Sequence, residues 1–162
     1  MLHLVVFICF VAIGWFVYRD YKLRKQFFES FLLLCDHMTT EIGFSKRTVS
    51  QIIDISIESY SPQFAQMLLG FRALLSNNQD ITRENLSEHM WSRLKPAERA
   101  FMCDFFMELG RHGAAEELDK IARKKSRGQV FCTAATEALK RDASIYFKIC
   151  ILLGIAAVIL LL

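Results

Sequence analysis

Glycine-rich loops and metal-ligand patterns are absent from this chain of 162 residues. Its 7 glycines are isolated, and Gly110-Arg111-His112-Gly113 lacks the spacing and the following Lys-Ser or Lys-Thr of a nucleotide-binding loop. Cys35 and His37 are two residues apart, so on a helix they point to different faces and make a poor metal pair. No Ser, Asp or Glu pattern indicates a nucleophile or an acid–base pair. We therefore expect a noncatalytic protein without cofactor, metal or small-molecule substrate.

Cysteine is too sparse and too scattered for a disulfide framework. Of the 5 cysteines, Cys9 and Cys150 fall in apolar segments, which leaves the odd set Cys35, Cys103 and Cys132. Unpaired thiols in the middle of the chain fit a reducing cytoplasm.

Charge is missing from both ends of the chain. Every charged residue except Lys148 lies in residues 19–142, where 19 Lys and Arg face 17 Asp and Glu, a balance that gives no case for nucleic-acid binding. Residues 1–18 and 143–162 are apolar, and at about 1.5 Å per helical residue each approaches the roughly 30 Å of a bilayer core. We predict transmembrane helices over these two segments and a cytoplasmic helical domain over residues 19–142.

The first apolar segment is expected to be an uncleaved anchor, because it lacks the Lys or Arg n-region of a signal peptide and no small-residue cleavage site follows it. Lys148 must snorkel toward the headgroups, since only a short apolar stretch follows it. An alternative, that Ile149 to Leu162 is a buried core helix, is weakened by the lack of any polar side chain there. The positive-inside rule places the middle domain in the cytoplasm on the evidence of its basic flanks, namely Arg19, Lys22, Arg24, Lys25, Lys140 and Arg141.

The middle domain is predicted to be entirely helical. The first anchor is expected to continue as one helix to about Ile42, with Gly43 as its stop, and Ser45 could cap a second helix. Ser61 and Pro62 are expected to provide the cap and the first turn of a third helix. The expected apolar faces of the second, third and fourth helices are, in turn, Val49, Ile52, Ile53 and Tyr60; Phe64, Leu68, Phe71 and Leu75; and Leu86, Met90 and Leu94.

The fourth helix is expected to end before Pro96, which begins a fifth that carries Phe101, Phe105 and Leu109 on one face. From about Ala114 no strong breaker occurs except Gly128, whose cost in a helix is about 1 kcal/mol. A long helix should therefore run into the second anchor. The predicted fold class is an all-α antiparallel bundle of about six helices with terminal membrane helices.

Arg123-Lys124-Lys125-Ser126-Arg127 is the concentrated charge run outside the membrane flanks. On a helix its members spread over more than half of the circumference, which is typical of a solvated face. The functional alternative is a docking site for an acidic partner. Its candidate residues are Arg111, Arg123, Lys124, Lys125 and Arg127.

Two local motifs and their order along the chain indicate a family. Glu41-Ile42-Gly43-Phe44 is similar to a Glu-Ile-x-Tyr motif, and the stretch from Phe105 to His112 is similar to Phe-Gly-x-x-Leu-Gly-x-His, with Ile121 at a further matching position. The chain resembles the stage III sporulation protein AB family over its whole length. It departs from the family pattern at Arg47-Thr48-Val49, where Thr-Pro-Leu is typical, and at Gly113 and Glu117.

The resemblance implies a subunit of a secretion-like membrane complex between the mother cell and the engulfed forespore. The protein would lie in the mother-cell membrane around the forespore and act as a platform beside a cytoplasmic ATPase of the stage III sporulation protein AA type and other membrane subunits. Its domain would be similar to the six-helix cytoplasmic domains of type II secretion F proteins.

Two other classes are left open by the residues. A membrane-anchored regulator could bind amphipathic partner helices in a groove of an aromatic-rich bundle. A membrane enzyme would need buried polar groups with shifted pKa values in one pocket. A wide apolar groove would favour the regulator, whereas a closed bundle with polar patches would favour the platform.

Overall fold

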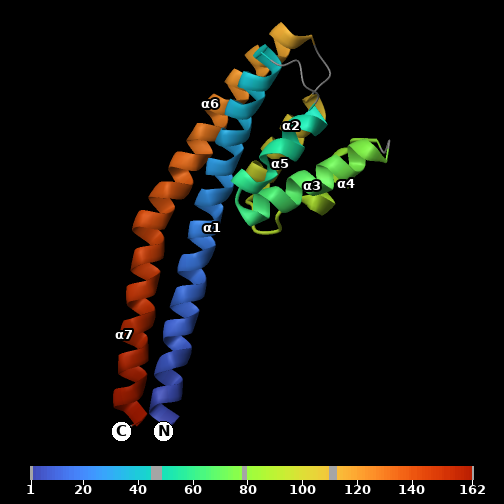
Figure 1. Ribbon diagram of the computed structural model, residues 1–162. Coiled ribbons are helices and arrows are strands. Elements are labelled where there is room, and N and C mark those ends of the chain that lie inside the picture. The colour runs from blue at the N-terminus through green and yellow to red at the C-terminus, as the bar shows by residue number, and fades with distance from the viewer. Residues whose placement is uncertain (1, 45–48, 78–79, 110–112, 162) are drawn as a thin grey trace. The chain divides into compact units, whose positions relative to one another are not determined.

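The computed structural model describes residues 2–44, 49–77, 80–109 and 113–161. Regular structure in these residues is helical throughout (Figure 1), which confirms the predicted all-α class. The elements are α1 (Leu2–Phe44), α2 (Val49–Ser56), the 3-10 turn η1 (Ile57–Ser59), α3 (Pro62–Ser76), α4 (Arg83–His89), α5 (Pro96–Glu108), α6 (Ala114–Ala138), the π-helical turn η2 (Leu139–Ala143) and α7 (Ser144–Leu161). Because α6, η2 and α7 follow one another without a break, the described residues form six helices.

The chain divides into two compact units, and the division falls inside α1 and inside α6. We call Met1–Lys25 with Thr133–Leu162 the terminal hairpin, and Gln26–Cys132 the bundle. The domain boundaries expected from the sequence, at residues 18/19 and 142/143, stay predictions.

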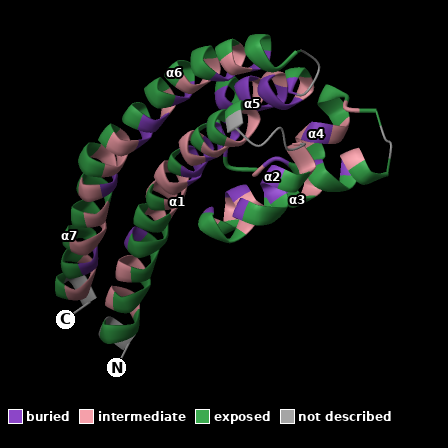
Figure 2. Ribbon diagram, turned by 45° about the horizontal axis from the view of Figure 1, so that its top comes forward, coloured by how far each residue is buried: buried purple, intermediate pink, exposed green. Residues whose placement is uncertain are grey.

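In the terminal hairpin, the first part of α1 and α7 run side by side in opposite directions (Figures 1 and 2). Glycine allows the close approach: a Cβ on Gly14 would lie 3.0 Å from the Cβ of Cys150 and 3.1 Å from the Phe147 ring. A Cβ on Gly154 would lie 3.1 Å from the Phe7 ring. Larger side chains at either glycine would force the two helices apart.

The two long helices that supply the terminal hairpin, Leu4–Gly43 and Ala114–Ile159 in extent, are long and apolar enough to cross a membrane. Only 6% and 11% of their most apolar windows is buried within the protein, and Leu152, for example, is 65% exposed. A helix in the core of a soluble protein would be mostly buried, so these two helices suggest membrane association.

Phenylalanine dominates the core of the bundle. Phe31 of α1 is fully buried, with its ring centroid 5.4 Å from that of Phe101 and 5.0 Å from that of Phe105, both edge to face. Such aromatic pairs add about 0.5–1.5 kcal/mol each beyond their buried area. Gly128 of α6 packs on the same ring, because a Cβ there would lie only 2.3 Å from Phe31 Cε1. Gly128 lowers the intrinsic stability of α6, but it is needed because no larger side chain would fit against the Phe31 ring.

Prolines set the starts of two helices, as the sequence predicted, whereas the predicted Ser61 cap is not formed, because the Ser61 side chain makes no capping hydrogen bond. Pro62 and Pro96 begin α3 and α5, and the Glu98 carboxylate accepts a hydrogen bond from the Lys95 backbone N–H at 3.0 Å. Ser45, the cap expected for the second helix, lies outside the described residues.

The fourth helix is shorter than predicted. It ends at His89, with an extended backbone at Met90, whereas the apolar spacing predicted helix as far as Leu94. Met90 and Leu94 are nevertheless buried, at 6% and 5% exposure. Burial of these two side chains is achieved by a turn, so periodicity alone overestimated the helix length.

Candidate docking surfaces on the bundle

The basic run predicted as a docking site lies on α6, but its members do not share one surface. Lys124 Nζ lies 3.2 Å from Glu108 Oε2 of α5, and Lys125 Nζ forms an ion pair with Asp36 of α1. The two lysines therefore connect α6 to two neighbouring helices. Arg111, the fifth predicted residue, lies outside the described residues.

Arg123, Arg127 and Val130 form an exposed strip on α6, because positions i, i+4 and i+7 share one helix face. Val130 is 66% exposed, and the Arg127 guanidinium carbon lies 5.6 Å from the centroid of the Phe101 ring. Arg123 makes no ion pair with another described residue. The α6 strip thus combines two cations with one exposed apolar side chain.

Val130 was not predicted from the sequence as a surface residue of this strip, because only the charged residues 123–127 were considered and Val130 lies beyond them. The signal was available: Val130 follows Arg123 by seven residues, one heptad along the same face.

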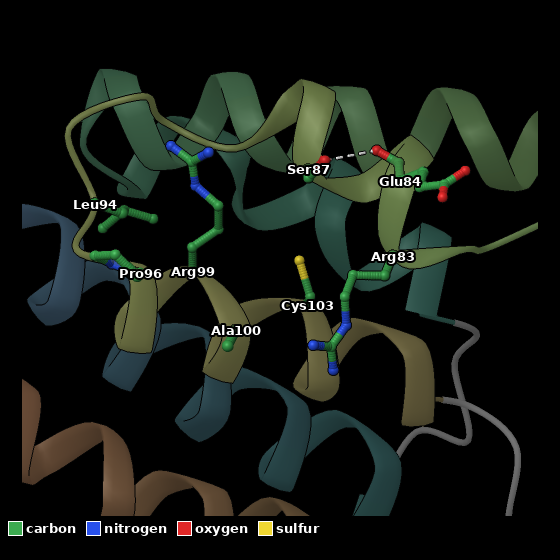
Figure 3. A pocket seen from close by; sticks show the side chains of 8 residues that line it. All are labelled: Arg83, Glu84, Ser87, Leu94, Pro96, Arg99, Ala100 and Cys103. Carbon is green, nitrogen blue, oxygen red and sulfur yellow. Dashed lines mark hydrogen bonds between the residues drawn. The ribbon is translucent and has the colours of Figure 1, made fainter.

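A groove lies between α4 and α5, with a volume of about 590 Å³ (Figure 3). This volume is in the range of ligand pockets, about 300–1,000 Å³. Small or apolar side chains line it, together with Glu84 and two arginines. The lining residues are Arg83, Glu84, Ser87, Leu94, Pro96, Arg99, Ala100 and Cys103.

The two arginines of the groove differ in their partners, because within the described part of the chain only Arg83 forms an ion pair that neutralises its charge. Arg83 pairs with Asp104, and the Glu84 carboxylate points away from Arg99 (Figure 3). Arg99 donates from Nη2 to the Ser92 carbonyl at 3.1 Å, while its buried Nε–H has no acceptor among the described residues. A buried donor without a partner costs about 1–3 kcal/mol.

Cys103 contributes a neutral, apolar wall to the groove. Burial raises the pKa of this thiol, chiefly by desolvation, with a smaller opposing effect of the Arg83 charge. The thiolate is the nucleophilic form of cysteine, so a raised pKa makes Cys103 unreactive at neutral pH. Among the residues that the structure describes, no group of three His, Cys, Asp or Glu side chains could hold a metal ion.

Comparison with known proteins identifies a family for the chain. Neither a curated protein nor a solved structure matches the chain. The family model of stage III sporulation protein AB matches residues 1–162, the full length that the sequence resemblance covers. The chain therefore belongs to the stage III sporulation protein AB family.

Proposed function

We propose that this protein is a noncatalytic platform subunit of a secretion-like complex in the mother-cell membrane around the forespore. The observation that carries the proposal is the family match over the whole chain, which implies a role in stage III of sporulation. Two apolar helices would anchor the protein, and the bundle would face the cytoplasm, where it docks an ATPase of the stage III sporulation protein AA type.

The α6 strip is the part of the basic run best suited to docking. Lys124 and Lys125 have acidic partners in the bundle, so they contribute less free charge to a second protein. Arg123 and Arg127 are exposed and lie on one face with Val130. Exposed cations accelerate and orient association with an acidic surface, and a central apolar contact adds affinity.

Binding of the purified ATPase to the full chain in nanodiscs tests this proposal. Reversal of all five basic residues would be ambiguous, because Glu at 124 and 125 would face Glu108 and Asp36 and weaken the fold. Arg123→Glu combined with Arg127→Glu should raise Kd at least tenfold, and added salt should weaken wild-type binding. Val130→Ala should cost less.

Gln129→Glu is the matched control, since it adds negative charge to an exposed position on another face of α6. It should leave Kd unchanged. Equal ATPase affinity of the double variant and the wild type, with sporulation intact, would reject the α6 strip as the docking surface.

The groove between α4 and α5 favours a second candidate function, capture of a partner segment by a membrane-anchored regulator. Its arginines make it unsuited to a purely apolar helix, whereas a segment that carries one carboxylate beside small apolar side chains would complement it. Ala100→Phe should fill the groove and abolish such binding while the thermal midpoint stays within a few degrees. Sporulation that proceeds normally in the Ala100→Phe strain would argue against this candidate.

A further inference from the structure

Aromatic side chains mark one level of the terminal hairpin. Trp15, Tyr18 and Tyr146 are 60%, 37% and 51% exposed, and the Trp15 and Tyr18 rings stack with centroids 6.5 Å apart. Gly14 lies against Phe147 and Cys150, so in this antiparallel pair Tyr146 is level with the turn from Trp15 to Tyr18. Exposed Trp and Tyr at one height are typical of the membrane–water boundary.

Cations from both helices lie just beyond this aromatic level. Lys22 follows Gly14 by eight residues, about 12 Å along the helix axis. The same step back along the partner helix, from Phe147 and Cys150, leads to residues 139 and 142 of η2 (Leu139–Ala143). This turn contains Lys140 and Arg141. Lys22 and Lys140 therefore lie at similar heights on adjacent helices, and both are exposed.

The carboxylates at this height interact with cations other than Lys22 and Lys140. Asp142 accepts a hydrogen bond from Arg141 Nε at 2.8 Å, and Glu137 also acts on that guanidinium. Asp20, Arg24 and Lys25 have partners of their own, and the Arg19 guanidinium lies 5.6 Å from the Phe16 ring centroid. Neither Lys22 nor Lys140 forms an ion pair with another described residue.

We propose that Lys22 and Lys140 form a binding site for the phosphate of an anionic phospholipid at the inner end of the terminal hairpin. The inference rests on the proposed membrane anchoring. Two ammonium groups at headgroup height attract a lipid of net negative charge, each by about 1 kcal/mol, which corresponds to about fivefold in affinity. A zwitterionic lipid carries a cation beside its phosphate and gains little. The π-helical turn η2 supports a specialised role, because such turns occur frequently at functional sites.

Trp15 is a built-in reporter for this site, since it lies about two turns from Lys22 and the chain has only 2 tryptophans. The full chain with Trp91→Phe is placed in nanodiscs of phosphatidylcholine that contain an equal fraction of either brominated phosphatidylglycerol or brominated phosphatidylcholine. Bromine quenches tryptophan fluorescence only at contact, so the ratio of quenching gives the relative occupancy of the two lipids. We expect a preference for phosphatidylglycerol of at least fivefold.

Lys22→Gln combined with Lys140→Gln should reduce this preference to near onefold, and 0.5 M salt should do the same to the unsubstituted lysines. Lys95→Gln, at an exposed lysine of the bundle, is the matched control and should change nothing. Equal quenching by the two lipids would overturn the lipid site while leaving membrane anchoring intact. Absence of quenching by either lipid would instead reject the anchoring itself. Loss of the preference on addition of millimolar inorganic phosphate would assign the lysines to free phosphate and overturn the lipid proposal.

Discussion

A single buried ring explains why α6 contains a glycine. In an exposed helix, Gly→Ala stabilises by about 1 kcal/mol, and the sequence alone treats Gly128 as a tolerated breaker. The Phe31 ring is fully buried and occupies the space of a Cβ at position 128. Sequence reasoning could not find this requirement, because the two residues are far apart in the chain.

Gly128→Ala should therefore destabilise the protein, by about 1–3 kcal/mol after the helix-propensity gain is included. Gly43→Ala is the control: it also lies in a helix, and a Cβ there meets nothing within 4 Å. That variant should be neutral or slightly stabilising. Thermal unfolding of both full-length variants in the same detergent checks the difference, and similar midpoints would contradict the packing role of Gly128.

Cys35 predicts a pH dependence of stability. Burial, with a smaller effect of the Asp36 carboxylate, raises the pKa of this thiol from 9.0 to about 12. The folded state therefore favours the protonated thiol, and this stabilisation is complete below pH 9 and is lost as the pH rises toward 12. Between those values the free energy of unfolding should fall by up to about 1.4 kcal/mol per pH unit through this group.

Cys35→Ala removes that contribution. The variant should be less stable at pH 8, because a cavity replaces the sulfur, but its stability should fall less steeply than that of the wild type between pH 9 and 10.5. Chemical denaturation at several pH values in that interval measures the two slopes. Parallel slopes would mean that the Cys35 thiol titrates normally in the folded protein.

At the scale of elements, a chain of hydrogen bonds joins α1 to the end of α2. Ser56 Oγ donates to the Ile52 carbonyl at 2.6 Å, and Tyr60 Oη donates to Ser56 Oγ at 2.8 Å. Each hydroxyl proton is thereby used, so the 2.9 Å contact between His37 Nδ1 and Tyr60 Oη requires His37 to donate from Nδ1. The network fixes the tautomer of His37 and the position of α2 relative to α1.

Tyr60→Phe should cost about 1–3 kcal/mol, because it leaves the His37 donor without its acceptor and Ser56 without its donor while the ring is retained. Ser76→Ala is the control, since that exposed hydroxyl bonds only to carbonyls of its own helix. It should change stability by no more than about 0.5 kcal/mol. A loss in Tyr60→Phe as small as that in Ser76→Ala would argue against the network.

The elements that the sequence predicted well are those with local causes. The long terminal helices follow from apolar runs without breakers, and the starts of α3 and α5 follow from Pro62 and Pro96. Features that depend on a partner far away in the sequence could not be predicted from the sequence. Lys125 meets Asp36 across 89 positions of sequence, so its ion pair, unlike its charge, could not be derived from the run on α6. The similarity to type II secretion F domains stays a prediction.

For the whole molecule, the basic inner flanks predict that the bundle faces the cytoplasm and that both ends of the chain lie on the opposite side. Cysteine labelling can test this, but the native thiols of the bundle are poor reporters. Cys35, Cys103 and Cys132 are 0%, 1% and 7% exposed. A reagent would miss them from either side of the membrane.

Val130 offers a better position, since it is 66% exposed on α6. In vegetative cells that express a chain whose 5 native cysteines are replaced by Ala or Ser, Val130→Cys should resist a membrane-impermeant maleimide while the cells are intact and react after permeabilisation. A cysteine appended after Leu162 is the matched control and should react in intact cells, because the hairpin carries both ends across the bilayer together. Labelling of Val130→Cys from outside, with the appended cysteine protected, would reverse the topology. It would also place the α6 strip beyond the reach of a cytoplasmic ATPase, so this experiment constrains the proposed docking as well as the orientation.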